Sequence, residues 1–162
     1  MLDIVTLGDE VLREQVDEIK DVNGEIADLA QNMISAMYHG DGVGLAAPQV
    51  GLLKSMFVCH VNGDQPRVFI NPQIIGTSQE LLPYEEGCLS IPGMYGDVIR
   101  PATVTVQAVN EQGKPFKLDA EGLLARVIQH ELDHLKGVLF IDHLDEKQRE
   151  RLIKAYNKKM RK

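Results

Sequence analysis

The residues with the clearest chemical meaning form a short motif near the C-terminal end, where residues 129–134 read QHELDH. His130 and His134 are four residues apart, so on a helix both imidazoles lie on one face and can bind one metal ion. Glu131 follows the first histidine and can accept a proton from water at that metal. This pattern is typical of metal-assisted hydrolysis of an amide-like bond. The alternative is a solvated helix on which the two histidines have no joint role.

A catalytic metal site of this kind usually has three protein ligands and one open position for water. Phe140 stands where a longer zincin signature requires its third histidine. The remaining downstream candidates have no motif context: His143, Glu146 and Glu150. Upstream, Cys88 lies in a turn-rich stretch, EGCLSIP at residues 86–92, where its side chain can approach a metal. Cys59 lies in an apolar run and is better explained as a small packing residue.

A second stretch with chemical potential is GVGLAAPQVG at residues 42–51. Its glycines allow a backbone to approach a ligand closely. The side-chain amide of Gln49 could donate a hydrogen bond to an oxyanion. Taken alone, the stretch is better explained as an ordinary loop with a capping glutamine.

Taken together, these segments resemble the peptide deformylase family. Its patterns G-x-G-x-A-A-x-Q, E-G-C-x-S and H-E-x-x-H occur in this order at residues 42–49, 86–90 and 130–134. The resemblance spans nearly the whole chain. It implies a metal-dependent hydrolase that removes the N-terminal formyl group from formylmethionyl nascent polypeptides and releases formate. It also implies an α+β fold, in which a central metal-binding helix is surrounded by short, mainly antiparallel strands, with N-terminal and C-terminal helices.

The resemblance also implies a role for each matched residue. The implied metal ligands are Cys88, His130 and His134. The implied catalytic groups are Glu131, the Gln49 amide and the backbone N–H of Leu89. The implied substrate-binding residues are Val43, Gly44, Glu86, Gly87, Leu123 and Val127. One cysteine and two histidines are compatible with Fe(II), Zn(II), Ni(II) or Co(II), and the resemblance favours Fe(II) as the physiological ion.

The spacing on the metal-binding helix supports an apolar pocket beside the metal. Leu123 and Val127 precede His130 by seven and three residues, so all three lie on one helix face. Burial of these apolar residues in the core is the alternative, but the resemblance favours a pocket for methionine. Some relatives carry an arginine after the cysteine segment, where this chain has Met94 and Tyr95. We expect Arg126 to face off the ligand stripe, at the cleft rim or in solvent.

Composition favours one soluble domain. The chain has 162 residues, 44% hydrophobic and 25% charged, which suits a single catalytic domain over residues 1–162. We expect no secretory signal, no membrane span and no membrane partner. Two cysteines in unlike contexts do not suggest a disulfide, so we expect a cytoplasmic, reducing location. We also expect a monomer.

Charge is distributed unevenly along the chain. Residues 147–162 hold eight lysines and arginines against one acid, a net +7 on a chain whose total is −7. This basic C-terminal helix could bring the protein to the ribosome, where formylated chains emerge. A solvated helix end whose lysines complement the helix dipole is the equal alternative.

The hydrophobic periodicity predicts the main elements of the fold. Helices are expected over 25–38, 122–136 and 145–160, and strands over 56–61, 67–70, 103–109 and 115–118, with a hairpin loop at 110–113. Two other functions compete with deformylation. A general H-E-x-x-H peptidase is disfavoured by the missing downstream ligand and by Cys88. A zinc-stabilised binding module is disfavoured because no fourth ligand stands out.

Overall fold

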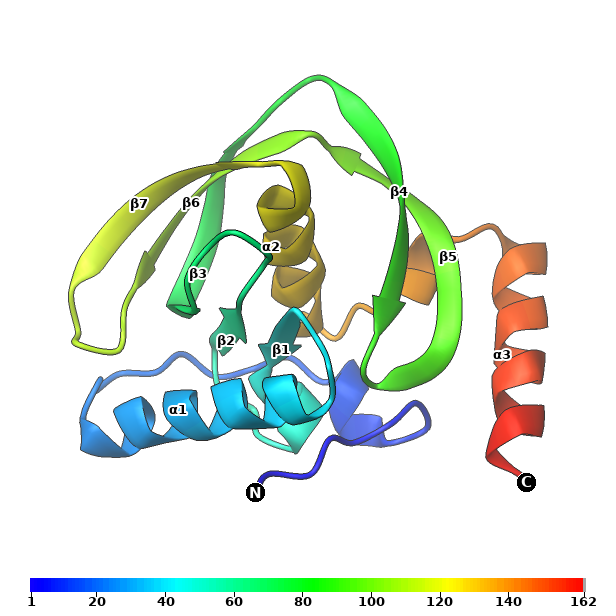
Figure 1. Ribbon diagram of the computed structural model, residues 1–162, viewed down its shortest axis with the longest axis horizontal. Coiled ribbons are helices and arrows are strands. Elements are labelled where there is room, and N and C mark those ends of the chain that lie inside the picture. The colour runs from blue at the N-terminus through cyan, green and yellow to red at the C-terminus, as the bar shows by residue number, and fades with distance from the viewer. Residues whose placement is uncertain (162) are drawn as a thin grey trace.

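One helix, α2 (Gly122–His134), lies between two antiparallel sheets in the computed structural model (Figure 1). The structure describes residues 1–161. The larger sheet has the strand order β1-β2-β3-β6-β7, and the smaller is a ribbon of β4 and β5. The strands are β1 (Gly44–Ala46), β2 (Met56–Cys59), β3 (Arg67–Thr77), β4 (Leu81–Cys88), β5 (Ile91–Pro101), β6 (Thr103–Val109) and β7 (Pro115–Glu121). The predicted α+β class is confirmed.

The larger sheet is covered on both faces, which explains the continuous apolar run in β2. Phe57 and Cys59 face the apolar cluster beneath α2. Met56 and Val58 face the opposite cluster, which packs against α1 (Gly24–His39). A strand covered on both faces needs apolar side chains at every position rather than at alternate ones. The sheet therefore holds α1 and α2 on opposite sides and fixes the position of α2.

The predicted helices and the four predicted strands are all present, some of them with other bounds. Helix α1 begins after Asn23, whose side-chain oxygen accepts the N–H of Ile26 at 3.2 Å, as expected of an N-cap. Strand β6 has the predicted bounds, and the loop between β6 and β7 closes through the N–H of Asn110 and the carbonyl of Lys114, 2.9 Å apart. Strands β3 and β7 run further than predicted.

The β4–β5 ribbon is the largest element that the sequence did not predict. The sequence indicates a turn-rich stretch over residues 86–92, but the turn is confined to Leu89 and Ser90, between two long strands. Within β4 only Glu86 is buried, so the strand has no alternation of apolar and polar residues to reveal it. The ribbon lies on the far side of α2 from the larger sheet (Figure 1).

Helix α3 (Glu146–Met160) packs against the outer side of β5 (Figure 1). Tyr156 is buried in a third apolar cluster, together with Ile91 and Val98 of the ribbon. The ammonium group of Lys159 donates to the carbonyl of Pro92 at 3.1 Å. The C-terminal helix is thus part of the folded body. Within residues 1–161, none of the helices combines the length and the apolar character that a membrane crossing requires.

Candidate metal centre

The structure brings together three side chains that can bind a metal. Cys88 ends β4, while His130 and His134 project from successive turns of α2. One potential ligand atom from each lies within 4.8 Å of the others. The Cys88 sulfur is 3.4 Å from Nε2 of His134. One thiolate and two imidazoles form a donor set suited to a borderline-soft transition metal, so these residues fit the ion that the sequence implies.

Glu86 determines which nitrogen of His130 faces the other two ligands. Its carboxylate lies 2.9 Å from Nδ1 of His130, which therefore carries the proton and leaves Nε2 free to bind a metal. Burial would raise the pKa of Glu86, but hydrogen bonds from His130 and Arg100 hold it well below its ordinary value. Glu86 is therefore a carboxylate throughout the neutral pH range.

The two histidines differ in their electrostatic surroundings. Burial alone would lower the pKa of His130, but hydrogen bonds to Cys88 and Glu86 outweigh it and raise this pKa well above its ordinary value. The surroundings that favour a proton there also favour a metal cation, so protons and metal compete for this site. Burial and the neighbouring His130 lower the pKa of His134 well below its ordinary value. His134 therefore stays neutral, the form that binds metals.

Glu131 lies beside these ligands with an unpaired oxygen. Its Oε2 is 4.0 Å from Nε2 of His130, and its buried Oε1 has no hydrogen-bond partner among residues 1–161. Burial raises the pKa of Glu131 to about 7. Gly44 makes room for this carboxylate, because a Cβ at that position would stand 2.5 Å from Oε2. A desolvated carboxylate with a raised pKa is suited to general acid–base catalysis.

A hydrogen bond from the nearby backbone orients the side chain of Gln49 toward the same cluster. The N–H of Ala46 donates to its Oε1 at 2.9 Å, which fixes the side-chain amide. The Nε2 group then faces the Cys88 sulfur at 3.4 Å and the hydroxyl of Ser90 at 3.1 Å. Gln49 is buried in the short helix η2 (Ala47–Val50). This segment, for which the sequence alone favours a loop, therefore presents a fixed donor to the site.

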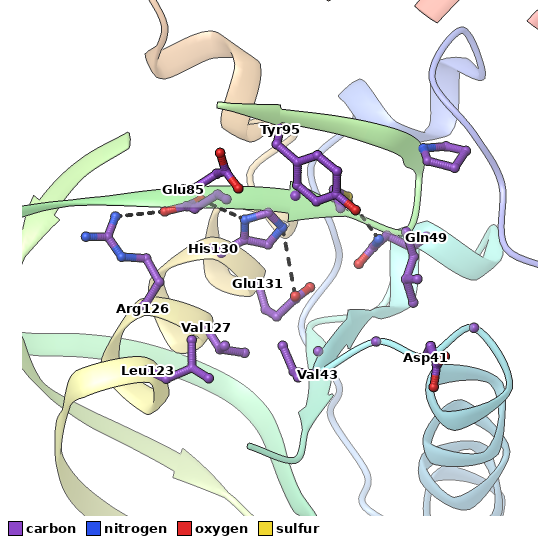
Figure 2. A pocket seen from close by; sticks show the side chains of 18 of the residues that line it. Asp41, Val43, Gln49, Glu85, Tyr95, Leu123, Arg126, Val127, His130 and Glu131 are labelled. Carbon is purple, nitrogen blue, oxygen red and sulfur yellow. Dashed lines mark hydrogen bonds and ion pairs between the residues drawn. The ribbon is translucent and has the colours of Figure 1, made fainter. Parts of the chain in front are cut away.

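The cluster opens into a pocket of about 500 Å³. Every site residue implied by the sequence lines this pocket except His134, which is buried. Figure 2 shows Val43 on one side, Glu131 and His130 in the middle, and Leu123 and Val127 at the base of α2. Tyr95 also lines the pocket, whereas Met94 packs into the cluster beneath α3. The pocket thus has an apolar end on α2 that leads up to the candidate ligands.

The expectation that Arg126 lies at the cleft rim or in solvent is wrong about solvent, although the residue does line the pocket. Its side chain is buried, and its guanidinium donates to Glu86 at 2.8 Å instead of reaching solvent. The prediction considered the Leu123–Val127 stripe and overlooked that Arg126 precedes His130 by one helical turn. Arg100 was also missed: it pairs with Glu86 at 2.7 Å and with Asp133 at 2.9 Å. No local pattern predicts these partners, because they lie on separate elements.

Known proteins resemble this chain in both sequence and fold. The family model described as polypeptide deformylase matches residues 1–150. A peptide deformylase of Agrobacterium fabrum is 47% identical, over 98% of this chain and 95% of that protein. A crystal structure of a peptide deformylase from Legionella pneumophila has a TM-score of 0.94 at 37% identity, covering 99% of this chain and 96% of that one.

A third relative has been solved with a bound small molecule. The peptide deformylase of Synechococcus elongatus, solved in complex with actinonin, has a TM-score of 0.91 at 45% identity. The match covers 98% of this chain and 87% of that one. Sequence and fold therefore agree over nearly the whole length, and the chain belongs to the polypeptide deformylase family, enzymes that remove the formyl group from the N-terminus of nascent polypeptides.

Proposed function

We propose that this protein hydrolyses the formyl amide of N-formylmethionyl peptides at one metal ion bound by Cys88, His130 and His134. The observation that carries the proposal is the convergence of these three donors within 4.8 Å, beside Oε1 of Glu131, which has no hydrogen-bond partner within the described residues 1–161. When bound, a divalent ion would act as a Lewis acid toward the formyl oxygen and make water more acidic. Fe(II) is proposed as the physiological ion, with Zn(II), Ni(II) and Co(II) able to bind the same donors.

Glu131 acts as general base and then as general acid. Its carboxylate accepts a proton from the water that attacks the formyl carbon. It then delivers that proton to the peptide nitrogen as the carbon–nitrogen bond breaks, which gives formate and a free N-terminus. Burial raises the pKa of this carboxyl, which strengthens it as the proton acceptor in the first transfer. Burial of the carboxylate excludes bulk water that would otherwise solvate it.

Gln49 and Leu89 are proposed to stabilise the oxyanion that forms during attack. The Gln49 amide is fixed by Ala46 and directs its N–H groups toward Cys88. The backbone N–H of Leu89 follows Cys88 directly in the turn of the ribbon. One donor of this kind is typically worth about 3–4 kcal/mol of activation free energy. The Gln49 amide stays held at its oxygen by Ala46, and one of its N–H groups, which otherwise face Cys88 and Ser90, would turn to the oxyanion.

The substrate is proposed to bind through its methionine side chain and its backbone. The methionine lies against Leu123 and Val127, which form the apolar end of the pocket. The peptide backbone extends between residues 43–44 of one wall and residues 86–87 of the other, in the manner of an added strand. Backbone hydrogen bonds do not read side chains, so the enzyme accepts varied residues beyond the first.

A formate-release assay tests this function. The protein is incubated with formyl-Met-Ala-Ser, acetyl-Met-Ala-Ser and an unblocked peptide that contains Met-Ala-Ser internally, and metal content is measured on the same samples. We expect a new free amine from the formylated peptide only, with formate released from it in proportion to bound metal. Cleavage of the internal peptide would indicate a general peptidase instead. Formate release that persists after complete removal of the metal would contradict the proposed centre.

Association with the ribosome through α3 is proposed as well. Lys147, Lys154 and Lys158 are exposed on this helix and belong to the basic block. Replacing all three by glutamine should weaken co-sedimentation with ribosomes at low salt while leaving hydrolysis of short peptides intact. The control variant carries glutamine in place of Lys20 and Lys114, which are exposed and far from α3 in sequence. Equal co-sedimentation of the two variants would mean that the block is a solvated surface.

We propose a monomeric, cytoplasmic enzyme. Both cysteines are free. A metal-binding thiolate requires a reducing compartment, because oxidation of the sulfur destroys its capacity to bind the ion. Light scattering at several protein concentrations, and fractionation of cells that produce the protein, test these two statements separately.

A further inference from the structure

Arg126 connects α2 to both strands of the ribbon from a buried position. Its Nη1 donates to Oε2 of Glu86 and to the carbonyl of Val98, both at 2.8 Å. Its Nη2 donates to the carbonyl of Leu82 at 2.7 Å. Glu86 and Leu82 belong to β4 and Val98 to β5, so one guanidinium holds both strands to a helix that is distant from them in sequence. Figure 2 shows this side chain rising from α2 toward the ribbon.

The geometry of these bonds requires arginine. The guanidinium is planar and presents several N–H donors in fixed directions, whereas a lysine ammonium is a single point of charge. The central carbon of the Arg126 guanidinium also lies over the ring of Tyr84, 5.6 Å from the ring centroid. The side chain is therefore constrained by its hydrogen bonds and by this contact with the ring. Such a group can fix the position of its partners rather than merely neutralise their charge.

The partner that matters for the reaction is Glu86. One carboxylate oxygen of Glu86 accepts from Arg126, and the other lies 2.9 Å from Nδ1 of His130. Arg100 contacts both oxygens from another direction, at 2.7 and 3.0 Å. The orientation of His130 therefore depends on a carboxylate whose own position depends on two arginines. The ribbon that Arg126 holds also carries Cys88, so the spacing between the cysteine and histidine ligands depends on the same contact.

We propose that Arg126 is a positioning residue for deformylation, which acts through Glu86 and the ribbon and not on the substrate. This inference rests on the function proposed above. Arg126 lines the pocket, but its Nη1 and Nη2 atoms are bonded to Glu86, Val98 and Leu82 of the ribbon. Loss of the guanidinium should therefore reduce kcat and metal retention more than it raises KM. Partners of this kind, outside the ligand set, are typically worth about 10- to 100-fold in activity or metal affinity.

Chemical rescue tests the proposal. Arg126→Ala leaves space at the position of the guanidinium, and sub-denaturing guanidinium chloride should restore part of the lost kcat, whereas sodium chloride of equal ionic strength should not. Arg126→Lys keeps the charge but not the fork, so its kcat should also fall and should not recover. The control is Arg67→Ala, which removes a two-pronged pair with Asp64 at the start of β3 and should keep the wild-type kcat.

A second readout does not depend on activity. The rate at which a chelator removes the metal should increase in Arg126→Ala and Arg126→Lys, and guanidinium should slow it in the alanine variant only. Wild-type kcat in the lysine variant would overturn the proposal, as would a rise in KM without loss of kcat or of metal. If the alanine variant does not fold, the same two measurements on the lysine variant decide between these outcomes. Failure of the wild-type protein to release formate would instead overturn the proposed function, while metal retention would still test Arg126.

Discussion

The wall of the pocket formed by β1 and η2 is held by apolar packing, whereas the wall formed by the β4–β5 ribbon is held by buried charges. The first wall belongs to the larger sheet, whose side chains pack against α1 and α2. The second meets α2 through Glu86, Arg100 and Arg126, which are all buried. Both walls supply site residues: Gln49 comes from the first and Cys88 from the second.

This difference explains why the ribbon wall, and not the sheet wall, orients a histidine ligand. Apolar packing is non-directional, so it can hold a backbone in place but does not orient a carboxylate or an imidazole. Charge-assisted hydrogen bonds are directional, and those of Glu86 fix the ring of His130. The buried charges therefore orient the side chains of the ribbon wall. If one charge is removed, its partners remain buried without a compensating charge.

The largest difference between the walls should be seen in their cysteines. Cys88 ends β4 in the ribbon, and Cys59 is buried in β2 of the sheet, where burial raises its pKa to about 12. Cys88→Ser should lose the metal and reduce kcat/KM by more than about 100-fold, because even partners outside the ligand set are worth about 10- to 100-fold. Cys59→Ser should keep both. Equal activity losses in the two variants, with metal retained, would contradict the ligand assignment.

The next largest difference is expected in the kcat of two glycine variants, at Gly44 in the first wall and at Gly87 in the ribbon wall. A Cβ at Gly44 would stand 2.5 Å from Oε2 of Glu131 and 2.9 Å from a methyl of Val127, whereas a Cβ at Gly87 would clash with the ring of the exposed Tyr95 at 2.6–2.7 Å and otherwise meet the Met94 carbonyl at an ordinary 3.5 Å. Gly44→Ala should reduce kcat by about 100-fold, because a displacement of about 1 Å at a reacting group can cost this much. Gly87→Ala should cost less, since an exposed ring can turn aside. Steady-state kinetics of both variants decide the order.

The two walls should also differ in how their contribution to stability changes at acidic pH. The pKa of Glu86 is lowered in the folded protein, so its stabilising effect is complete above the unfolded pKa of about 4.3 and is lost as pH falls toward the folded pKa. Glu86→Gln should cost about 3–5 kcal/mol at neutral pH, because it removes the carboxylate that two buried arginines share, and only Arg100 keeps another, that of Asp133. The variant should also lose less stability than the wild type on acidification below about pH 4.

The sheet supplies the control for this experiment. Phe57→Leu removes part of a ring stacked on Phe69, with centroids 4.6 Å apart, and involves no titrating group. This variant should be less stable than the wild type at every pH, with an unchanged acid dependence. Denaturant titrations from acidic to neutral pH measure both effects. Parallel pH curves for wild type and Glu86→Gln would refute the role of charge in the ribbon wall.

The smallest effect is expected where the ribbon meets α3 at the surface. Lys159 is exposed, and its bond to the carbonyl of Pro92 is 3.1 Å long. Lys159→Ala should change the free energy of unfolding by no more than about 0.5 kcal/mol, as is usual for surface substitutions. Thermal unfolding measures it. A loss as large as that of Glu86→Gln would show that exposed contacts, rather than the buried charges, hold this wall.

The parts of the fold that the sequence predicted are those with regular burial. Helix α1 and strand β6 present apolar residues at the helical and strand periods, because each packs one face against the core. The ribbon has no such pattern, since most of β4 is exposed and its one buried residue is Glu86. Its existence depends on pairing with β5 and on ion pairs to α2, which are long-range and leave no local signal.

The site, like the fold, was predicted where a local sequence pattern marks its residues. Motifs located Cys88 and His130, which the structure brings together. Glu86 was predicted as a substrate contact only, and its hydrogen bond to His130 was not foreseen. The position of Arg126 was predicted wrongly, because a charged side chain is expected in solvent unless its buried partners are known. The spacing to His130 could have indicated where the Arg126 side chain points. It could not have indicated that Glu86, Leu82 and Val98 accept its hydrogen bonds.

The most direct measurement of the central claim compares Glu131→Ala with the wild type in formate release at equal, measured metal content. Glu131 is proposed to transfer the proton and not to bind the ion, so the variant should retain its metal and lose about 10²–10⁴-fold in kcat. Its affinity for formyl-Met-Ala-Ser should change little. A variant that binds metal normally and releases formate at the wild-type rate would contradict the account.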